Sequence, residues 1–229
     1  LANMSHEIRT PLNAIRGVTA IAEYYADDME KQAECRHKVM QASGFLMELV
    51  NNVLNMNKLE SGEMKPENKP FDLIELLTET ASIVEMQGQE YAIRFQMQMG
   101  KHKYRHLIGS PLYLKQVLQN IGGNAVKYNR AGGAVTFASE DVAYSDGRAV
   151  IKFTCTDTGR GMSREFLVHA FEPFSQENTD ARTTFTGTGL GLAITKQMVE
   201  LMEGTISLKS EQNVGTTISV TIPFRIDVD

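Results

Sequence analysis

A histidine, a glutamate and a threonine lie close together in the stretch Ser5 to Leu12, near the start of the chain. A neutral imidazole can attack a phosphoryl group through one ring nitrogen while a carboxylate takes the proton from the other, so His6 and Glu7 can form a nucleophile and its base. Thr10 shares a helix face with His6, because the two are four residues apart. Pro11 has no N–H for the carbonyl of Glu7 and predicts a kink one turn below His6. A histidine on a helix surface is more often a solvated residue or a helix cap, so residues further along the chain must decide whether His6 is a nucleophile.

Four polar residues near the middle of the chain can project towards one side of a helix: Asn120, Asn124, Lys127 and Tyr128. Amide oxygens are neutral hard ligands that suit a Mg²⁺ ion which keeps its waters and binds substrate phosphates. The lysine can place charge beside a phosphate, and the tyrosine can pack against a base. Gly122 and Gly123 each cost about 1 kcal/mol relative to alanine, which indicates close packing or ligand approach. Taken alone, the segment would be an ordinary polar helix face.

An aspartate and two glycines, Asp157, Gly159 and Gly161, follow a predicted strand. An aspartate at a strand end can accept a hydrogen bond from an exocyclic amine, and the glycines let a ligand approach the backbone. Aspartate and glycine are also ordinary turn residues, so this motif by itself decides little.

A glycine-rich turn, Thr186 to Leu192, opens a predicted helix. Backbone N–H groups of such a turn at a helix N-terminus form an anion site. The turn is not a P-loop, because no Gly-Lys-Ser/Thr follows, and it is not the dinucleotide fingerprint, because position 192 is not glycine. The stretch before it, Phe171 to Phe185, is polar and lacks apolar periodicity, which indicates a mobile lid.

The histidine needs a helix to present it, and the sequence predicts two amphipathic helices at the start of the chain. Apolar residues recur at three- and four-residue spacing from Leu12 to Tyr25, and again from about Glu34 to Leu59. The short polar connection from about Asp27 to Gln32 makes the pair an antiparallel hairpin. Two helices cannot bury both apolar stripes, so we expect a symmetric dimer that forms a four-helix bundle. The alternative is that the hairpin packs on the domain that follows.

The polar residues further along need a different scaffold. Residues 63–70 form a polar break, which predicts a linker between a helical hairpin over 1–62 and a catalytic domain over 71–229. Helices are predicted from Asp72, from Pro111 to Tyr128, after a cap at Ser163, and from Leu190 to Met202 with Gly204 ending it; strands are predicted near 93–99, 135–142, 149–156, 205–209 and 216–224. This order predicts a mixed sheet with helices on one face, an α+β sandwich.

Composition and charge exclude several classes of protein. The net charge of -5 gives no reason to expect nucleic acid as a partner. No apolar run approaches the roughly 20 residues that a membrane span needs, and no secretory signal is present. Cys35 and Cys155 are far apart and belong to no Cys/His cluster, which indicates reduced thiols in a cytosolic compartment and no zinc site. The sequence begins at Leu1 inside a helix pattern, so we expect a fragment of a longer polypeptide.

In their joint order these motifs resemble the transmitter region of sensor histidine kinases over nearly the whole chain, and a hybrid sensor kinase is one source of such a region. The matching segments are Ser5 to Leu12 for the histidine box, Asn120 to Tyr128 for the asparagine box, Asp157 to Gly161 and Gly187 to Leu192 for the two glycine boxes, Phe171 to Phe174 for the phenylalanine box, and Gly215 to Thr217 for the closing glycine motif. The nucleotide region is similar to the wider Bergerat-fold ATPases, which include gyrase and the heat-shock chaperone. The resemblance implies a dimeric helical hairpin followed by an α+β sandwich of the Bergerat type.

The resemblance also implies a role for each matching residue. His6 would be the phosphoacceptor, Glu7 its base, and Thr10 would position water for dephosphorylating the partner. Asp157 would read the adenine amine, and Asn124 would hold Mg²⁺. The residues placed around the nucleotide and its phosphates would be Asn120, Asn124, Lys127, Tyr128, Asp157, Gly159, Gly161, Phe174, Gly187, Thr188, Gly189, Leu190, Gly191 and Thr216.

The function that the resemblance implies is an ATP- and Mg²⁺-dependent histidine autokinase of a two-component system. It would pass the phosphoryl group from His6 to an aspartate of a response-regulator receiver domain, separate or fused C-terminally, and act as a phosphatase towards it. We expect a homodimer through the hairpin, a cytoplasmic location, and membrane contact only through a sensor region outside this chain.

Two other functions compete with this one. The first is a plain ATP-hydrolysing Bergerat-fold machine, of the kind found in mismatch repair or topoisomerases. Relatives that hydrolyse ATP generally carry a glutamate base at the position of Asn120, and an amide is a poor base. The second is a non-catalytic dimerisation scaffold, which is disfavoured because every expected catalytic residue type is present.

Overall fold

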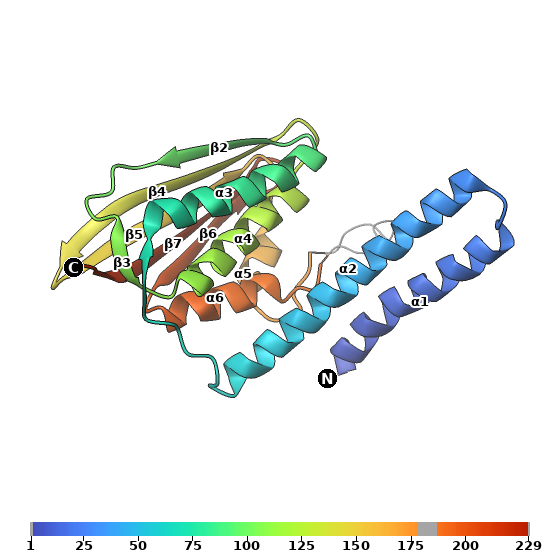
Figure 1. Ribbon diagram of the computed structural model, residues 1–229, viewed down its shortest axis with the longest axis horizontal. Coiled ribbons are helices and arrows are strands. Elements are labelled where there is room, and N and C mark those ends of the chain that lie inside the picture. The colour runs from blue at the N-terminus through green and yellow to red at the C-terminus, as the bar shows by residue number, and fades with distance from the viewer. Residues whose placement is uncertain (1, 178–186, 229) are drawn as a thin grey trace. The chain divides into compact units, whose positions relative to one another are not determined.

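The structure is a computed structural model that describes residues 2–177 and 187–228 (Figure 1). The chain divides into two compact units, and each is described by itself. The first unit is Leu1–Glu63 together with Glu172–Gly191, and the second is Met64–Phe171 together with Leu192–Asp229. Most of the lid predicted between Phe171 and Phe185 lies outside the described residues.

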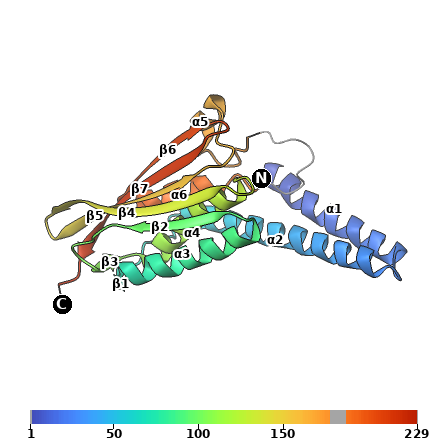
Figure 2. The same ribbon diagram turned by 90° about the horizontal axis from the view of Figure 1, so that it is seen from above.

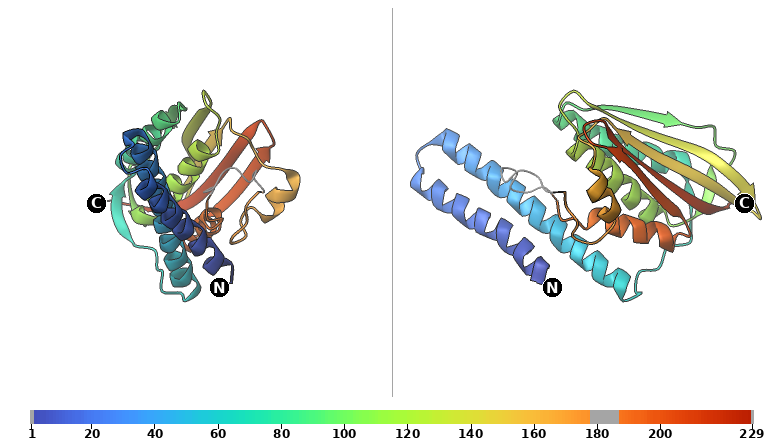
Figure 3. Two further views of the ribbon diagram at one scale, coloured as in Figure 1. Left: turned by 90° about the vertical axis from the view of Figure 1, so that its right-hand side faces the viewer. Right: turned by 180° about the vertical axis from the view of Figure 1, so that it is seen from behind.

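Two long helices form an antiparallel hairpin in the first unit (Figure 3). α1 spans Ala2–Tyr24 and α2 spans Met29–Glu60. The side-chain amide of Gln32 closes the hairpin by donating to the carbonyl oxygens of Ala22 at 2.6 Å and Tyr25 at 3.0 Å. α1 continues through Pro11, and the kink expected there remains a prediction. No helix in the described part of the chain is both long and apolar enough to cross a membrane.

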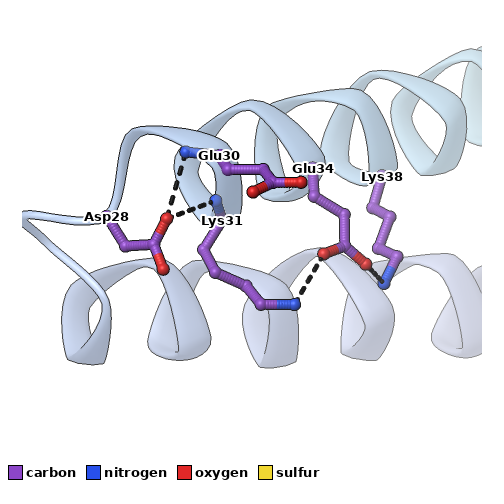
Figure 4. A network of polar contacts seen from close by, with 5 residues as sticks. All are labelled: Asp28, Glu30, Lys31, Glu34 and Lys38. Carbon is purple, nitrogen blue, oxygen red and sulfur yellow. Dashed lines mark hydrogen bonds and ion pairs between the residues drawn. The ribbon is translucent and has the colours of Figure 1, made fainter.

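The second helix begins more than a turn before the predicted start near Glu34. Asp28 caps it, and its Oδ1 accepts from the N–H groups of Glu30 at 3.1 Å and Lys31 at 3.0 Å (Figure 4). Glu34 then pairs along the helix with Lys31 at 3.0 Å and Lys38 at 2.7 Å, and hydrogen bonds from Lys38 and Lys31 lower the pKa of Glu34 to about 2. The prediction was wrong here because charged residues spaced for ion pairs on an exposed helix face were taken for a connection.

A seven-stranded mixed sheet forms the second unit, in the order β1-β3-β7-β5-β4-β2 with β6 also paired to β7. β2 pairs with β4 in parallel, and the other described pairs are antiparallel. The strands are β1 Lys69–Asp72, β2 Arg94–Met99, β3 His106–Gly109, β4 Ala134–Ser145, β5 Arg148–Asp157, β6 Thr205–Glu211 and β7 Gly215–Ile226. The helices are α3 Leu73–Glu90, α4 Pro111–Lys127, the short α5 Arg164–His169 and α6 Gly191–Leu201.

The core of this unit lies between the sheet and the helices α3, α4 and α6, which cover one face of the sheet (Figure 2). Side chains alternate along the central strands, as a half-buried antiparallel sheet requires. Fully buried side chains include Ile151 and Phe153 on β5 and Val220 and Ile222 on β7, and the helices contribute Leu73, Leu114, Val117 and Val199. The helical hairpin followed by an α+β sandwich is the predicted fold class, and that prediction is confirmed.

Two strands, β1 and β3, are not predicted from the sequence. Each has four residues, which is too short for a period-two pattern to be visible. β1 pairs with β3, and β3 pairs with the end of β7. These strands exist because a neighbouring strand supplies their hydrogen bonds, and a local pattern cannot report a distant neighbour.

The end of α6 also differs from the prediction. The left-handed residue that follows the helix is Glu203, with a φ of 59°, rather than Gly204. A Cβ on Gly204 would lie 2.7 Å from the carbonyl oxygen of Thr221. Gly204 is therefore needed for close packing against β7, and the left-handed position after α6 is taken by Glu203, a less favourable residue type.

Asp72 caps α3, as predicted, and this cap has a testable effect on stability. Its Oδ1 accepts from Glu75 N–H at 3.0 Å, and Oδ2 pairs with Arg105. Burial raises the pKa of Asp72, but these bonds outweigh it and the net pKa is lowered. The carboxylate therefore stabilises the fold above its unfolded pKa, and this stabilisation is lost as the pH falls through the folded value. We expect Asp72→Ala to lower the free energy of unfolding by about 1 kcal/mol at neutral pH, measured by urea unfolding.

The matched control is Glu85→Ala, which removes an exposed carboxylate from the same helix. That variant should stay within about 0.5 kcal/mol of the parent protein. An equal loss in the Asp72 variant at neutral and at strongly acidic pH would contradict the electrostatic part of this account.

Candidate functional site

α4 presents the predicted polar residues in one row. Asn120, Asn124 and Tyr128 are half-buried, and Lys127 is exposed. The adjoining face of the helix is packed into the core through Val117, Leu118, Ile121, Ala125 and Val126. Tyr128 ends the helix, and its N–H donates to the carbonyl of Asn124 at 3.0 Å. The row therefore lies at the rim of the core, where amide and phenol groups remain accessible to a ligand.

One of the two glycines inside α4 is explained by packing. A Cβ on Gly122 would lie 2.7 Å from side-chain atoms of both Phe137 and Val84. A Cβ on Gly123 would have only Gln87 Oε1 nearby, at 3.8 Å. Of the two reasons that the sequence left open, close packing therefore holds for Gly122.

Tyr128 carries a cation on its ring that the sequence did not reveal. Arg160 Cζ lies 4.5 Å from the ring centroid, and the Arg160 N–H donates to the carbonyl of Tyr128 at 3.2 Å. Lys127 Nζ lies 5.8 Å from the same centroid. A guanidinium at this distance is attracted by the ring quadrupole. The segment that follows β5 therefore holds the tyrosine ring by both main chain and side chain.

Asp157, the last residue of β5, is held by two backbone N–H groups. Its Oδ1 accepts from Gly159 at 2.8 Å and from Thr216 at 3.2 Å. Burial raises the pKa of Asp157, and the two hydrogen bonds oppose this rise. Among the described residues no hydrogen bond goes to Oδ2, so that oxygen can accept from a ligand amine.

Three glycines around Asp157 are required by the protein's own backbone. A Cβ on Gly159, Gly161 or Gly215 would lie 2.6, 1.9 or 2.0 Å from a carbonyl oxygen of a neighbouring segment. Gly161 also has a φ of 64°, which favours glycine. From the sequence, these glycines were expected to let a ligand approach the backbone. In the structure they let neighbouring backbone segments of the chain pack closely against one another.

The glycine-rich turn is described from Gly187 onward and belongs to the first unit. Thr188 is only 2 % exposed, and its Oγ1 accepts from the Asn52 amide of α2 at 3.0 Å and from Leu190 N–H at 3.3 Å. The side-chain amide of Gln176 donates to the carbonyl of Gly187 at 2.8 Å. Two amide side chains therefore fix the turn, and neither was identified from the sequence.

Phe174 meets this turn at Gly189. A Cβ on Gly189 would lie 2.7 Å from the carbonyl carbon of Phe174. Leu190 is fully buried, and Gly191 begins α6. The predicted residues of the phenylalanine box and the second glycine box thus form one cluster, from which a helix N-terminus starts.

His6, Glu7 and Thr10 lie on α1. The side chain of His6 lies outside the described residues, whereas Glu7 is half-buried and Thr10 is exposed. Because His6 and Thr10 are four residues apart on this helix, they share a face. The helix predicted to carry the three residues is present.

The donor chemistry of the described residues favours one kind of metal. They contain no group of three or more His, Cys, Asp and Glu side chains that could hold a metal ion. An amide oxygen such as that of Asn124 suits Mg²⁺, which keeps several waters and completes its shell with substrate phosphates. The residues on α4 therefore fit a Mg²⁺ ion that arrives with a phosphorylated ligand.

Two protein-family models match the chain. The His Kinase A (phospho-acceptor) domain matches residues 1–62. The Histidine kinase-, DNA gyrase B-, and HSP90-like ATPase matches residues 109–226, which is just over half of the chain. The chain belongs to the histidine kinase family. The resemblance inferred from the motifs is thereby confirmed.

This histidine kinase is similar to several named signalling proteins. It is 31% identical over 226 residues to the Sensory/regulatory protein RpfC of Xanthomonas campestris and 32% identical over 229 residues to the Sensor histidine kinase GacS of Pseudomonas protegens. It is also 32% identical over 229 residues to the Signal transduction histidine-protein kinase BarA of Escherichia coli. These matches cover 99%, 99% and 100% of this chain but 31%, 25% and 24% of the relatives. The chain therefore spans about a quarter to a third of their length.

Solved structures agree on the fold. The crystal structure of full-length ShkA in complex with AMPPNP is 27% identical, with a TM-score of 0.71, and the match covers 100% of this chain and 46% of that chain. The Acinetobacter baumannii histidine kinase AdeS is 20% identical, with a TM-score of 0.68 over 95% of this chain and 96% of its own. At 20% identity, the likeness to AdeS is evidence for the fold alone.

Four residues that contact the predicted site were missed from the sequence: Asn52, Arg160, Gln176 and Thr195. Arg160 stands inside a matching motif, so its position was visible although its contact with Tyr128 was not. Asn52 and Thr195 reach partners 136 and 75 residues away in the chain. No local pattern signals such a contact.

The buried carboxylate of Asp157 gives a prediction in which stability and binding move in opposite directions. Because burial raises its folded pKa, its contribution to stability is largest below the unfolded pKa and is lost as the pH rises through the folded value. Asp157→Asn removes the charge but keeps an oxygen that can accept from the two N–H groups. We expect a higher urea midpoint at neutral pH, a flatter pH dependence, and adenine-nucleotide binding at least about tenfold weaker, measured by titration calorimetry.

Asp146→Asn is the control, because Asp146 is exposed in the turn between β4 and β5. The Asp146 variant should change neither the urea midpoint nor the affinity for an adenine nucleotide. A fall in neutral-pH stability of the Asp157 variant, or unchanged nucleotide binding, would refute this reading of the carboxylate.

The hydrogen bond between Asn52 and Thr188 predicts a local effect on the glycine-rich turn. Asn52→Ala leaves the buried Thr188 hydroxyl without that donor, so the turn should open more often. We expect amide hydrogen exchange over residues 187–191 to quicken by about three- to tenfold, measured by mass spectrometry. Asn51→Ala, at an exposed position on the same helix, should leave the rate unchanged. Equal rates in both variants would show that the bond does not restrain the turn.

Proposed function

We propose that this histidine kinase transfers the γ-phosphoryl group of ATP to His6 and then to an aspartate of a response-regulator receiver domain. The observation that carries the proposal is the presence, in one chain, of a phospho-acceptor match over residues 1–62 and an ATPase match over residues 109–226. Two relatives support it through their own ligands. ShkA was crystallised with AMPPNP, and the fold neighbour ThkA was crystallised with the response regulator protein TrrA.

Asp157 and Tyr128 bind the base in this proposal. Asp157 Oδ2 accepts from the exocyclic amine of adenine, while Oδ1 stays with Gly159 and Thr216. Tyr128 lies along the adenine, and Arg160 fixes its ring orientation from 4.5 Å. Because a carboxylate accepts and cannot donate, this arrangement favours a base with an amine over one with a carbonyl at the same position.

The phosphates are bound by charge and by backbone N–H groups. Lys127 and Asn120 lie on the α4 row, and the turn from Gly187 to Gly191 leads into α6, whose N-terminus favours an anion. Asn124 would hold Mg²⁺ through its amide oxygen. When bound, the ion neutralises charge on the phosphate oxygens.

Transfer to the histidine is an in-line displacement. The lone pair of one His6 ring nitrogen forms the N–P bond as the bond between the γ-phosphorus and the leaving oxygen of ADP breaks. Glu7 accepts the proton from the other ring nitrogen. In the next step a receiver aspartate attacks the phosphohistidine and restores the imidazole. In a separate phosphatase reaction, Thr10 positions a water that attacks the phosphoaspartate of the receiver and releases inorganic phosphate and the free carboxylate.

A homodimer through the hairpin is part of the proposal. α2 leaves a stripe of large apolar side chains exposed at heptad-like spacing: Met40 at 73%, Met47 at 61%, Val50 at 38% and Leu54 at 51%. α1 exposes Leu12 at 54% and Ile21 at 50%. Apolar stripes on two long helices are the surface that a four-helix bundle buries. In this division residues 1–62 dimerise and accept the phosphoryl group, 63–70 link, and 71–229 bind ATP.

Phosphoryl labelling tests the central claim. We expect the chain with γ-labelled ATP and Mg²⁺ to form an adduct that is labile in acid and stable in base, because an N–P bond shows that behaviour and a phosphoester does not. His6→Gln should abolish the label, since its amide has no ring nitrogen to attack with. His37→Gln is the matched control, because it removes an exposed histidine from α2.

The outcomes separate the competing functions. Label that survives His6→Gln would refute the assignment of His6. Consumption of ATP without label would favour a hydrolysing machine, and neither ATP binding nor label would favour a scaffold. Asn124→Ala should abolish labelling while light scattering still reports a dimer, and full labelling in that variant would remove the metal role from Asn124.

A further inference from the structure

A hydrogen bond joins the asparagine row of α4 to the helix that follows the glycine-rich turn. The Asn120 amide donates from Nδ2 to Thr195 Oγ1, with 2.5 Å between the two atoms. Thr195 lies on α6, about one turn after its first residue, Gly191. The bond therefore connects the row expected to face the phosphates with the helix whose first N–H groups are expected to bind them.

Packing alone does not explain a threonine at this position. Thr195 is only 1 % exposed, and its neighbours on the buried side of α6 are Ala193, Ile194, Met198 and Val199. A buried hydroxyl is unfavourable unless it is hydrogen-bonded, whereas valine has nearly the same shape and no polar atom. The hydroxyl is therefore needed for a polar contact, and Asn120 makes one.

The contact restricts the position of the Asn120 side chain. An asparagine side chain can otherwise adopt several rotamers, and a hydrogen bond to a buried group on a neighbouring helix favours one of them. Asn120 and Asn124 are four residues apart and share a face of α4, so the restricted amide lies beside the residue proposed to hold Mg²⁺.

We propose that Thr195 is a positioning residue for nucleotide binding, because its hydroxyl holds the Asn120 side chain in place on α4. This inference rests on the proposed ATP-binding function and adds a residue to it. Thr195 itself needs no contact with the nucleotide. Its effect passes through Asn120, and it couples α4 to the start of α6.

Substitutions at Thr195 test the inference in the full chain by equilibrium binding of AMPPNP with Mg²⁺. Thr195→Val should weaken binding by about three- to tenfold, the range expected for one hydrogen bond. Thr195→Ser keeps the hydroxyl and should stay within about twofold of the parent. Thr80→Val is the matched control, because Thr80 is fully buried in α3 and its hydroxyl bonds to Leu76 of its own helix at 2.8 Å. That variant should bind like the parent protein.

A double-mutant cycle separates positioning from general damage to the fold. If Thr195 acts through Asn120, Thr195→Val should change the affinity of an Asn120→Ala protein by less than about twofold. The labelling rate should fall in the same variants as the affinity. Because Thr195 acts on nucleotide binding, the loss should appear in KM rather than in kcat.

Each result decides for or against the inference. The inference would be overturned if Thr195→Val kept the parental affinity, if the valine and serine variants lost affinity equally, or if Thr195→Val weakened binding by the same factor in the Asn120→Ala background. In each of these cases the ATP-binding proposal would stand. A parent protein that binds no AMPPNP would instead overturn the proposed function, and the inference with it.

Discussion

The position of the Asp157 carboxylate depends on the register between β5 and β7. Asp157 pairs with Thr216, and the Thr216 N–H reaches Oδ1 at 3.2 Å. A shift of one residue would turn the carboxylate to the other face of the sheet and separate it from that donor. Since burial disfavours the ionised form, the fold tolerates this group only where its hydrogen bonds are supplied. The long β5–β7 pairing, with its buried alternating side chains, thus fixes the chemistry at its end.

The glycines near this carboxylate serve the same constraint. A side chain on Gly215 would collide with the carbonyl of Asp157, and one on Gly159 would collide with the carbonyl of Tyr128. These contacts bring the end of α4, the end of β5 and the start of β7 together at one point. The glycines of this motif are therefore required by the packing of the backbone, whether or not a ligand is bound. In the proposed function a nucleotide benefits from this packing, because the segments around the carboxylate are already close together.

The sequence predicted those parts of the molecule whose causes are local. The amphipathic helices, the alternating strands β4 and β5, and the caps at Asp72 and Ser163 follow from spacing and from short-range hydrogen bonds. β1 and β3 could not be predicted, since they form by pairing with strands far along the chain. The same limit applies within the site: Asp157 with Gly159 was visible, whereas the contact of Asn120 with Thr195 spans 75 residues.

The side chains that hold the segments proposed to face the phosphates are amides, and the charge of a phosphate explains this choice. Asn52 fixes the glycine-rich turn through Thr188, and Asn120 bonds to Thr195 beside the α4 row. Each asparagine donates through Nδ2 and keeps an oxygen that can accept, without adding charge. A carboxylate at position 120 would repel phosphate oxygens, could not donate to Thr195, and would supply a base that activates water. An amide at position 120 therefore fits the proposed function, in which ATP is held for attack by an imidazole rather than by water.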